Sequence, residues 1–477
     1  MAAPAGRYHA ARGNTSTMTH NNTSNMSTPS TPPPGPHRFV IVGGGAGGLS
    51  LATQLGNKLG KKRRADITLV DGARTHVWKP LLHQLAAGSF DTHAEEIEYL
   101  AQARWNHFKF RLGHLTGVDR SAKTVQLAAS HDAAGREITP AQTLAYDTLV
   151  IAVGSQTNDF GTLGAAQHTI KLDSPEAAKH FNDQLINACI RAQSVPRAPG
   201  SGRLTVAIVG GGATGVELSA ELHAAARVLG NYGFDHINPE KDLQIVLVEA
   251  GPRLLAQLPE RLGLAAEREL RKLAIEVHTN EKVVEVSADG LKMASGKVIS
   301  SALTVWAAGV KAPDFLKTLG ADAEGAGGGT LEVNRLNQLM VNGNLQTTLD
   351  PSIYAFGDCA ACPQPGGTWV PPRAQAAYQQ AMYLTKALPQ LMAGNTAPGY
   401  VYKDQGSLVS LAQYTSVGSL MGSLSQGSFF IEGMLASFMY WALHKQHQLA
   451  LGGVKKTALI TLSELIDRAH RPRIKLH

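Results

Sequence analysis

The sequence predicts an α/β protein in which one strand–glycine loop–helix unit occurs twice. In the first unit, the apolar residues 39–42 read as a buried parallel strand and lead into a glycine motif at 43–48. In the second unit, the apolar residues 206–209 lead into the same motif at 210–215. A helical pattern follows each motif. A strand before such a loop and a helix after it are what a dinucleotide-binding domain requires, so we expect two Rossmann-like domains.

The three glycines of each motif have separate physical roles. The first permits a tight turn, the second lets the backbone approach a pyrophosphate closely, and the third lets the helix pack against the strand. The start of the helix adds free N–H groups and the positive end of the helix dipole. These glycines are Gly43, Gly45 and Gly48 in the first unit and Gly210, Gly212 and Gly215 in the second.

Each unit also has a second apolar strand that ends in a carboxylate. Residues 67–70 precede Asp71, and residues 245–248 precede Glu249. A carboxylate at this place accepts hydrogen bonds from the hydroxyls of an adenosine ribose. Glu249, in place of an arginine, favours the free 2′-hydroxyl of NADH over the 2′-phosphate of NADPH, although Arg253 nearby weakens that inference. Two dinucleotides in one chain indicate hydride transfer between a nicotinamide and a flavin.

Length and composition set bounds on the class of protein. At 477 residues, with 43% hydrophobic and 17% charged residues, the chain is long enough for two or three domains. The formal net charge of +7 suits an anionic membrane surface, nucleic acid or simple solubility and does not decide among them. No stretch approaches the roughly 20 apolar residues of a transmembrane helix, and the N-terminus lacks a signal pattern. The three cysteines are too few for a disulfide framework and favour a reducing, cytoplasmic compartment.

Small residues mark further places where the chain passes close to a cofactor. Two apolar strands end in Gly154 and Gly309, and residues 353–356 form a late apolar strand that leads into Gly357 and Asp358. Gly357 permits a close approach, and Asp358 offers an acceptor for a hydroxyl group. A surface aspartate after a strand is the alternative.

Together these features resemble the flavoproteins of the glutathione reductase type, which have two dinucleotide-binding domains. Within that group, several stretches resemble the bacterial type II NADH:quinone oxidoreductases, and the likeness covers residues 37–477. These stretches are residues 78–83, 210–219, 306–313, 371–376, 407–411 and 471–477. The resemblance implies an FAD domain that is interrupted by an NADH domain, followed by an amphipathic C-terminal membrane-binding region.

The expected segments follow from this arrangement and from composition. The first is rich in Ser, Thr, Asn and Pro, which is typical of disorder. We expect a disordered extension over 1–36, the first part of the FAD-binding domain over 37–160, the NADH-binding domain over 161–305, the second part of the FAD-binding domain with a quinone-site helix over 306–390, and the membrane-association region over 391–477.

The same resemblance assigns residues to the two nucleotides. It implies that FAD is held by Gly43, Gly45, Gly47, Gly48, Asp71, Lys79, Gly154, Gly357 and Asp358. It implies that NADH, the substrate, is held by Gly210, Gly212, Thr214, Gly215, Glu249 and Gly309. No metal is expected in the site.

Three residues are expected to act in catalysis. The resemblance places Glu217 close to the nicotinamide and the flavin, whereas its position on a first helical turn also suits a carboxylate that only meets the helix dipole. Gln375 and Gln379 are four residues apart and share one helical face, where two neutral amides suit the carbonyls of a quinone. Two solvent-facing glutamines are the alternative, and the resemblance places the quinone pocket at this helix.

The cysteines separate this chain from disulfide reductases of the same fold. Residues 75–90 lack the cysteine pair that such enzymes place beside the flavin. Cys359 and Cys362 follow Asp358, which is the wrong place for that relay. Their spacing would suit a soft metal, but a second pair of ligands is missing, so two ordinary reduced thiols are the preferred interpretation. Electrons must then pass directly from the reduced flavin to an external acceptor.

The C-terminal stretch combines apolar and basic residues. Residues 429–462 carry an apolar stripe at helical spacing that includes Phe438 and Trp441, and basic residues follow it. Such a stretch suits a membrane interface, with its charges among anionic headgroups. A dimer interface and a packed core helix are the alternatives.

We therefore expect an FAD-dependent enzyme that passes electrons from NADH to a membrane quinone without pumping protons. It would be peripheral to the cell inner membrane on the cytoplasmic side, would not bind nucleic acid, and would be compatible with a homodimer. A soluble NADH-oxidising flavoprotein, with oxygen, peroxide or a redox protein as acceptor, is one alternative. An NADH-responsive flavin-binding interaction protein is the other.

Overall fold

The computed structural model describes most of the chain. The described residues are 35–90, 96–194, 204–230, 238–320, 329–412, 415–421, 428–432 and 434–470. The chain divides into two units, residues 1–35 and 36–477, and all the helices and strands below belong to the second. The predicted extension therefore lies outside the described residues, apart from its last two positions, and so do residues 471–477.

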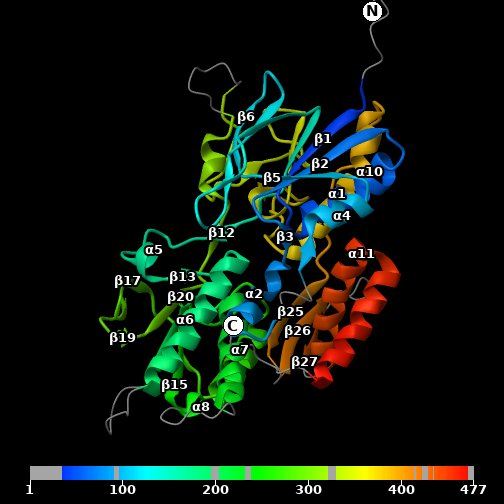
Figure 1. The fold of residues 1–477 in the computed structure, drawn as a ribbon. Coiled ribbons are helices and arrows are strands. Elements are labelled where there is room, and N and C mark those ends of the chain that lie inside the picture. Colours follow the sequence, from blue (N-terminus) through cyan, green and yellow to red (C-terminus); the bar gives the residue numbers. More distant parts are fainter. Residues whose placement is uncertain are drawn as a thin grey trace, which may run out of the picture. The chain divides into compact units, whose positions relative to one another are not determined.

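The first sheet has five parallel strands in the order β23-β11-β1-β2-β5. They are β1 (His37–Val42), β2 (Ala65–Asp71), β5 (Lys109–Leu112), β11 (Thr148–Ile151) and β23 (Ile353–Ala355). Figure 1 labels three of them, β1, β2 and β5. Strands β11 and β23 are largely apolar and fully buried, and β1 is buried over its last four residues, as is typical of strands covered on both faces, whereas the edge strand β5 exposes Lys109 and Arg111. Helices α1 (Ala46–Leu55) and α10 (Ala374–Met392) pack against each other beside this sheet. One of the two neighbours of β11, strand β23, thus comes from a much later part of the chain.

The second sheet repeats this arrangement with the order β13-β20-β14-β15-β16, also parallel. Its strands are β13 (Ile170–Lys171), β14 (Leu204–Val209), β15 (Leu243–Val248), β16 (Glu276–His278) and β20 (Leu303–Trp306). Its helices are α6 (Pro175–Ser194), α7 (Ala213–Gly230), α8 (Pro239–Asp242) and α9 (Glu260–Lys272). Two parallel, glycine-loop-containing sheets confirm the predicted α/β fold class.

Smaller elements complete the two parts. A three-stranded antiparallel sheet consists of β6 (Leu115–Asp119), β7 (Thr124–Leu127) and β10 (Gln142–Ala145), and another of β17 (Val283–Ser287), β18 (Gly290–Met293) and β19 (Val298–Ser300). Two-stranded pairs are β3 (Thr75–His76) with β4 (Ile97–Glu98), β8 (Ser130–His131) with β9 (Glu137–Thr139), and β22 (Leu339–Met340) with β24 (Ala360–Ala361). Short helices are α2 (Leu82–Ala87), α4 (Tyr99–Trp105) and α5 (Ala165–His168).

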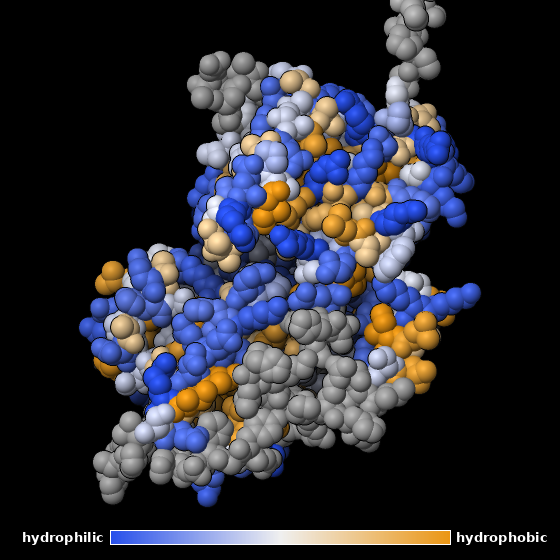
Figure 2. Space-filling model, viewed as in Figure 1, coloured by the Kyte–Doolittle hydropathy of each residue, from blue (hydrophilic) through white to orange (hydrophobic). Residues whose placement is uncertain are grey.

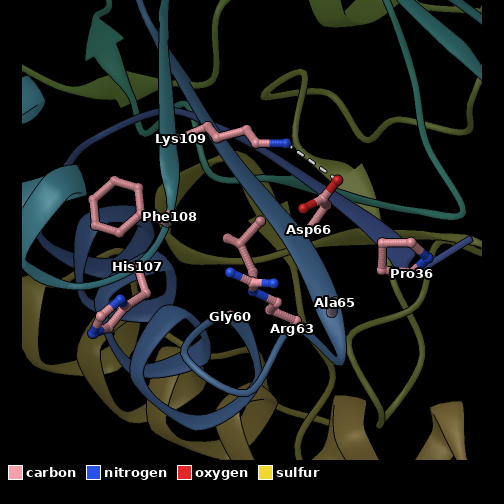
Figure 3. Close-up of a pocket in the computed structure, with 9 residues that line it drawn as sticks. Pro36, Gly60, Arg63, Ala65, Asp66, His107, Phe108 and Lys109 are labelled. Atoms are coloured by element: carbon pink, nitrogen blue, oxygen red, sulfur yellow. Dashed lines mark ion pairs between the residues drawn. The ribbon is translucent and has the colours of Figure 1, made fainter.

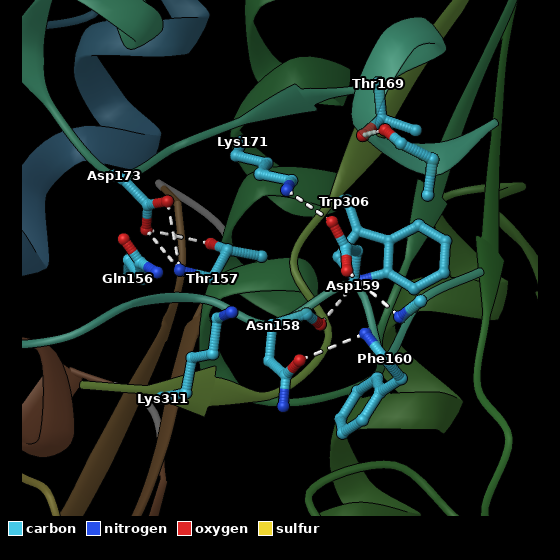
Figure 4. A network of polar contacts seen from close by, with 12 residues as sticks. Gln156, Thr157, Asn158, Asp159, Phe160, Thr169, Lys171, Asp173, Trp306 and Lys311 are labelled. Atoms are coloured by element: carbon cyan, nitrogen blue, oxygen red, sulfur yellow. Dashed lines mark hydrogen bonds and ion pairs between the residues drawn. The ribbon is translucent and has the colours of Figure 1, made fainter. Parts of the chain in front are cut away.

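Two crossing segments join the sheets side by side. Strand β12 (Gln156–Thr157) leaves the first sheet and pairs antiparallel with β21 (Val310–Lys311), which returns to it. Polar contacts fix the crossing (Figure 4): Asp173 accepts hydrogen bonds from the backbone N–H and the hydroxyl of Thr157. The Trp306 indole N–H donates to the Asn158 carbonyl at 3.0 Å. The segment that leaves the first sheet, at β12, and the segment that returns to it, at β21, therefore stabilise each other by hydrogen bonds.

The C-terminal region is a sheet and a helix that pack on both parts. Its antiparallel strands are β25 (Gly406–Leu411), β26 (Thr415–Met421) and β27 (Ser428–Glu432), and α11 (Met434–His470) follows. The Gln102 side chain donates to the Leu451 carbonyl at 2.7 Å, and Leu451 belongs to the core of the first sheet. Val409 and Leu411 belong to the core of the second. No helix in the described part of the chain has the length and apolarity that crossing a bilayer requires.

Candidate functional site

The two glycine loops have the same geometry. Gly43 and Gly210 have φ angles of 104° and 116°, which favour glycine. A Cβ on Gly48 would clash with the Gly43 carbonyl oxygen, and a Cβ on Gly215 would clash with that of Gly210. The third glycine of each motif therefore lets the helix start close against the strand end.

The middle glycine of each loop faces open space. A Cβ on Gly45 or on Gly212 would meet no atom within 4 Å. Helix α1 begins directly after Gly45, and no side chain caps its N-terminus. Free N–H groups at the positive end of a helix dipole favour an anionic group such as a pyrophosphate. The first loop thus fits the role that its sequence predicts, and the second loop has the same opening.

The two strand-end carboxylates also correspond. Asp71 accepts the backbone N–H of Gly44 at 2.5 Å and that of Ala73 at 2.8 Å. Burial raises the pKa of Asp71, although these two N–H groups oppose the rise. Each carboxylate lies at the edge of its glycine loop, where a ribose that follows the pyrophosphate would arrive.

Glu249 makes the matching contacts in the second unit. It accepts the N–H of Gly211 and of Gly251, each at 2.6 Å. The neighbouring Arg253 guanidinium donates to the carbonyls of Leu255 and Ala256 at 3.1 and 2.8 Å, so it is committed to its own loop. Because Arg253 is engaged in this way, it detracts less from the prediction that Glu249 favours NADH over NADPH.

Asp358 lies where the first sheet ends, beside the crossing segment. Its Oδ2 accepts the hydroxyl hydrogen bond of Ser155 at 2.8 Å, and Lys79 Nζ donates to the Ser155 carbonyl at 2.8 Å. Gly357, which precedes Asp358, has a φ of 75°. Gly154 has a φ of 71°, next to Ser155. The structure thus brings four predicted residues together, and it adds Ser155 as their shared partner.

Gln380 is a buried residue that sequence reasoning missed. Its side chain is 1% exposed, and its Oε1 accepts the Gly357 N–H at 2.8 Å. It therefore ties α10 to the loop that carries Asp358. The adjacent Gln379 drew attention by its spacing from Gln375, whereas nothing local distinguishes Gln380.

Glu217 is buried rather than merely exposed at a helix end. It is 7% exposed, its Oε1 accepts the Ser410 N–H at 3.0 Å, and its Oε2 lies 3.5 Å from His83 Nδ1. Burial raises the pKa of Glu217 to about 8, and the carboxyl of Glu221 adds to the rise. Burial lowers the pKa of His83 to about 4, so this histidine is neutral and the contact is no ion pair.

Glu221 lies one helical turn further along α7 and shares this environment. Its Oε2 accepts the Ser89 hydroxyl at 3.1 Å, and burial raises its pKa to about 7. Among the described residues, neither Glu217 nor Glu221 forms an ion pair with lysine or arginine. Two buried carboxyls without a cation are protonated more readily than exposed ones, because burial penalises the charged form.

Gln375 and Gln379 lie on α10, as predicted, with both side chains partly buried. Their carboxamides are occupied: Gln375 Nε2 donates to the Gly406 carbonyl at 2.9 Å, and Gln379 Nε2 donates to that of Lys403 at 2.8 Å. They are therefore not simply solvent-facing. Their partners are backbone groups that no local sequence signal connects with α10.

The cysteines are free and buried. Cys359 and Cys362 are both 0% exposed, and the Cys359 thiol donates to the Ile151 carbonyl at 3.5 Å. Burial raises the pKa of Cys359 to about 12 and that of Cys362 to about 11. Such thiols are poor nucleophiles because the reactive form is the thiolate.

Two cavities lie away from these residues. One of about 410 Å³ is lined by Pro36, Gly60, Ala65 and Lys109 among others (Figure 3). A second cavity, of about 300 Å³, is lined by Ile170, Leu303 and Thr304 among others. Both lie where strands of the two sheets begin, whereas ligands of such sheets bind outside the carboxyl ends of the strands. The glycine loops, Asp358 and the α10 start are at those carboxyl ends.

The chain is similar to known proteins along most of its length. The family model of the pyridine nucleotide-disulphide oxidoreductases matches residues 37–381. The type II NADH:quinone oxidoreductase of Haemophilus influenzae is 42% identical over 450 residues, which cover 92% of this chain and 99% of that protein. The type II NADH:quinone oxidoreductase NdhA of Mycobacterium tuberculosis is 31% identical, with 83% and 81% covered. The structure of NDH2 from Plasmodium falciparum in complex with NADH has a TM-score of 0.75 at 20% identity and covers 92% of this chain and 100% of that one.

The loop geometry predicts different outcomes for two neighbouring glycines. Gly45→Ala should fold with an unchanged melting temperature, because the φ of −59° suits alanine and its Cβ has space. The methyl group would occupy the path of the pyrophosphate, so copurifying dinucleotide should fall by about tenfold or more. Gly48→Ala is the matched control and should lower the yield of folded protein through its clash with Gly43. Full dinucleotide content in Gly45→Ala would contradict the assignment of this loop.

The buried carboxyls predict a pH-dependent stability. The folded-state pKa values of Glu217 and Glu221 are raised, so their contribution to stability is complete below about pH 4.5 and is lost as the pH rises through about 7 to 8. Glu217→Gln cannot ionise and should be more stable than the wild type at pH 9 by on the order of 1–3 kcal/mol, with no such gain at pH 4 to 5. Thermal melts across this range measure the difference. Exposed Glu98→Gln is the control, and identical pH profiles for all three proteins would contradict the interpretation.

Proposed function

The chain belongs to the pyridine nucleotide-disulphide oxidoreductase family and, within it, to the type II NADH:quinone oxidoreductases, and we propose how its residues serve that activity. It is a flavin-dependent enzyme that transfers electrons from NADH to a quinone, as the sequence predicts. The observation that carries the proposal is the repetition of one arrangement, a glycine loop with an open middle glycine and a carboxylate at its edge.

The flavin is proposed to be FAD, held by the first unit. The dinucleotide form is supported by the loop at Gly45, which fits a pyrophosphate, and by Asp71, which fits a ribose. Asp358 would accept a hydrogen bond from the ribityl chain, which links the pyrophosphate of FAD to the flavin ring. Lys79 is linked to Asp358 by Ser155, whose carbonyl accepts from Lys79 and whose hydroxyl donates to Asp358. The full proposed set is Gly43, Gly45, Gly47, Gly48, Asp71, Lys79, Gly154, Gly357 and Asp358.

NADH is proposed to bind the second unit. Glu249 would accept the ribose hydroxyls, and its charge would oppose a 2′-phosphate. The Arg253 guanidinium is engaged by carbonyls and does not offset that charge. The proposed set is Gly210, Gly212, Thr214, Gly215, Glu249 and Gly309.

When bound, the flavin accepts a hydride and then delivers two electrons. The protein's main contribution is to hold NADH and the flavin in the right orientation, since a well-oriented hydride donor and acceptor need little further catalysis. Glu217 is proposed to lie beside them with its carboxyl protonated, so that no fixed negative charge opposes the arriving hydride. Cys359 and Cys362 take no part, since both thiols are buried and protonated. The quinone is proposed to reach the site beside Gln375 and Gln379.

The quinone substrate and the C-terminal surface support a peripheral position at the membrane. Helix α11 exposes Val454 (73%), Leu459 (69%) and Leu462 (56%), and Figure 2 shows hydrophobic side chains gathered over this helix. Lys456 lies 4.4 Å from the ring of Trp105, which is itself 60% exposed. Apolar side chains with adjacent aromatic and basic groups suit a bilayer interface. We place this surface on the cytoplasmic side of the membrane, and a homodimer through the same face is the alternative.

An anaerobic spectroscopic titration tests the function. NADH should bleach the flavin absorbance, NADPH should do so at least about tenfold more slowly, and a quinone should restore it. Bleaching without reoxidation by quinone would favour an enzyme with another acceptor or a sensor protein. Equal rates with NADH and NADPH would contradict the role of Glu249.

Three substitutions on α11 test the membrane proposal. Changing Val454, Leu459 and Leu462 together to Gln should lower the fraction that cosediments with anionic vesicles by about tenfold or more, because each buried apolar side chain contributes about 1.5–3 kcal/mol. NADH oxidation with a water-soluble artificial acceptor should persist. The matched control changes Leu264, Val298 and Leu349, which are similarly exposed, and should sediment like the wild type. Equal sedimentation of both triple variants would place the anchor elsewhere.

A further inference from the structure

The first turns of α10 hold one short backbone segment, residues 403–406. Gln379 donates to the Lys403 carbonyl at 2.8 Å and accepts the Lys403 N–H at 3.1 Å. Gln375 accepts the Gln405 N–H at 3.2 Å and donates to the Gly406 carbonyl at 2.9 Å. Each carboxamide thus uses its oxygen and its nitrogen on this 403–406 segment.

An ion pair reinforces the same contact. Arg373 Nη1 lies 3.1 Å from Asp404 Oδ2, and Asp404 Oδ1 accepts the Gly406 N–H at 2.8 Å. Gln375 Nε2 also lies 3.4 Å from Asp404 Oδ1. The Asp404 side chain therefore contacts Gln375 of α10 and Arg373 at the N-cap of that helix, and it also closes the turn at Gly406.

These bonds replace a missing strand partner. The 403–405 backbone belongs to no strand, and it leads directly into β25, which begins at Gly406. A glutamine that pairs with both the N–H and the C=O of one residue reproduces the two-bond pattern of an antiparallel ladder. Backbone groups that would otherwise need water are satisfied in this way. The start of β25 is thus set by side chains of α10.

The far end of β25 reaches the buried carboxyl cluster. Ser410, four residues after Gly406, donates its N–H to Glu217 Oε1 at 3.0 Å. Val409 and Leu411, on either side, are 1% and 0% exposed and pack in the core of the second sheet. Strand β25 is therefore held at both ends, by α10 at Gly406 and by Glu217 and the core of the second sheet around Ser410.

We propose that Arg373, Gln375 and Gln379 are positioning residues, which hold the 403–406 segment as a wall of the quinone site. The proposal rests on the proposed function and deepens it. A quinone beside α10 meets a preformed wall, since the amide groups that would bond to its carbonyls are already paired. Direct amide contact with the quinone is the competing arrangement.

Substituting Asp404 distinguishes the two arrangements, because this residue belongs to the 403–406 segment and its removal leaves the amides of α10 in place. In Asp404→Ala, deuterium exchange of the backbone over 403–411 should speed up by about tenfold. The KM for a short-chain soluble quinone should rise by about tenfold, with the NADH-to-artificial-acceptor rate within about twofold of the wild type. Asp404→Asn keeps the Gly406 bond and should recover part of both losses. Unchanged flavin content shows that the variants are folded.

Asp132→Ala is the matched control. Asp132 also accepts the N–H of the residue two positions on, at 2.9 Å, and pairs with an arginine, Arg136, at 2.7 Å. It should alter neither the exchange of 403–411 nor the quinone KM. If Asp404→Ala leaves either quantity at the wild-type value, the proposal is overturned, and if Gln379→Leu alone then abolishes quinone reduction, the amides contact the quinone directly. A wild type that fails to reduce any quinone refutes the proposed function instead, and the exchange data still decide whether the segment is held.

Discussion

The structure depends on two carboxylates that each hold a glycine loop by its backbone. Asp71 and Glu249 end corresponding strands, and each accepts an N–H from the loop of its own unit. A loop with an open middle glycine has no side chain to fix its shape, so the carboxylate supplies the fixed point. One group therefore fixes the loop, and the same group is the one that we propose for ribose binding.

The C-terminal region gives the two nucleotide-binding parts a common frame. Leu451 packs in the core of the first sheet, whereas Val409 and Leu411 pack in that of the second. His76 on β3 and His447 on α11 are joined by a 2.9 Å hydrogen bond between their ring nitrogens, and burial lowers the pKa of both. This region is thus a packed element that touches both parts, in addition to any role at a membrane. The buried side chain of Leu451 serves this packing, whereas the membrane proposal concerns the exposed Val454, Leu459 and Leu462.

The sequence predicts what depends on local pattern. Strand and helix periods predicted the two parallel sheets, and the glycine spacing predicted the loops, because both follow from backbone geometry that recurs in every such unit. Gln380, Ser155 and the 403–406 segment were not predicted, since their roles come from contacts between distant parts of the chain. The burial of Glu217 was missed for the same reason. A first-turn glutamate looks alike in sequence whether water or β25 faces it.

The strand order of the first sheet has a consequence for the order of synthesis. Strands β1, β2, β5 and β11 precede the whole second sheet, yet β23, the neighbour of β11, follows it. The first sheet, which begins first, is therefore completed only after the second sheet. All five strands of the second sheet leave the ribosome while β11 still has an unpaired edge, and exposed strand edges favour pairing with other chains. A nascent chain of this topology carries that open edge until residue 355 has been added.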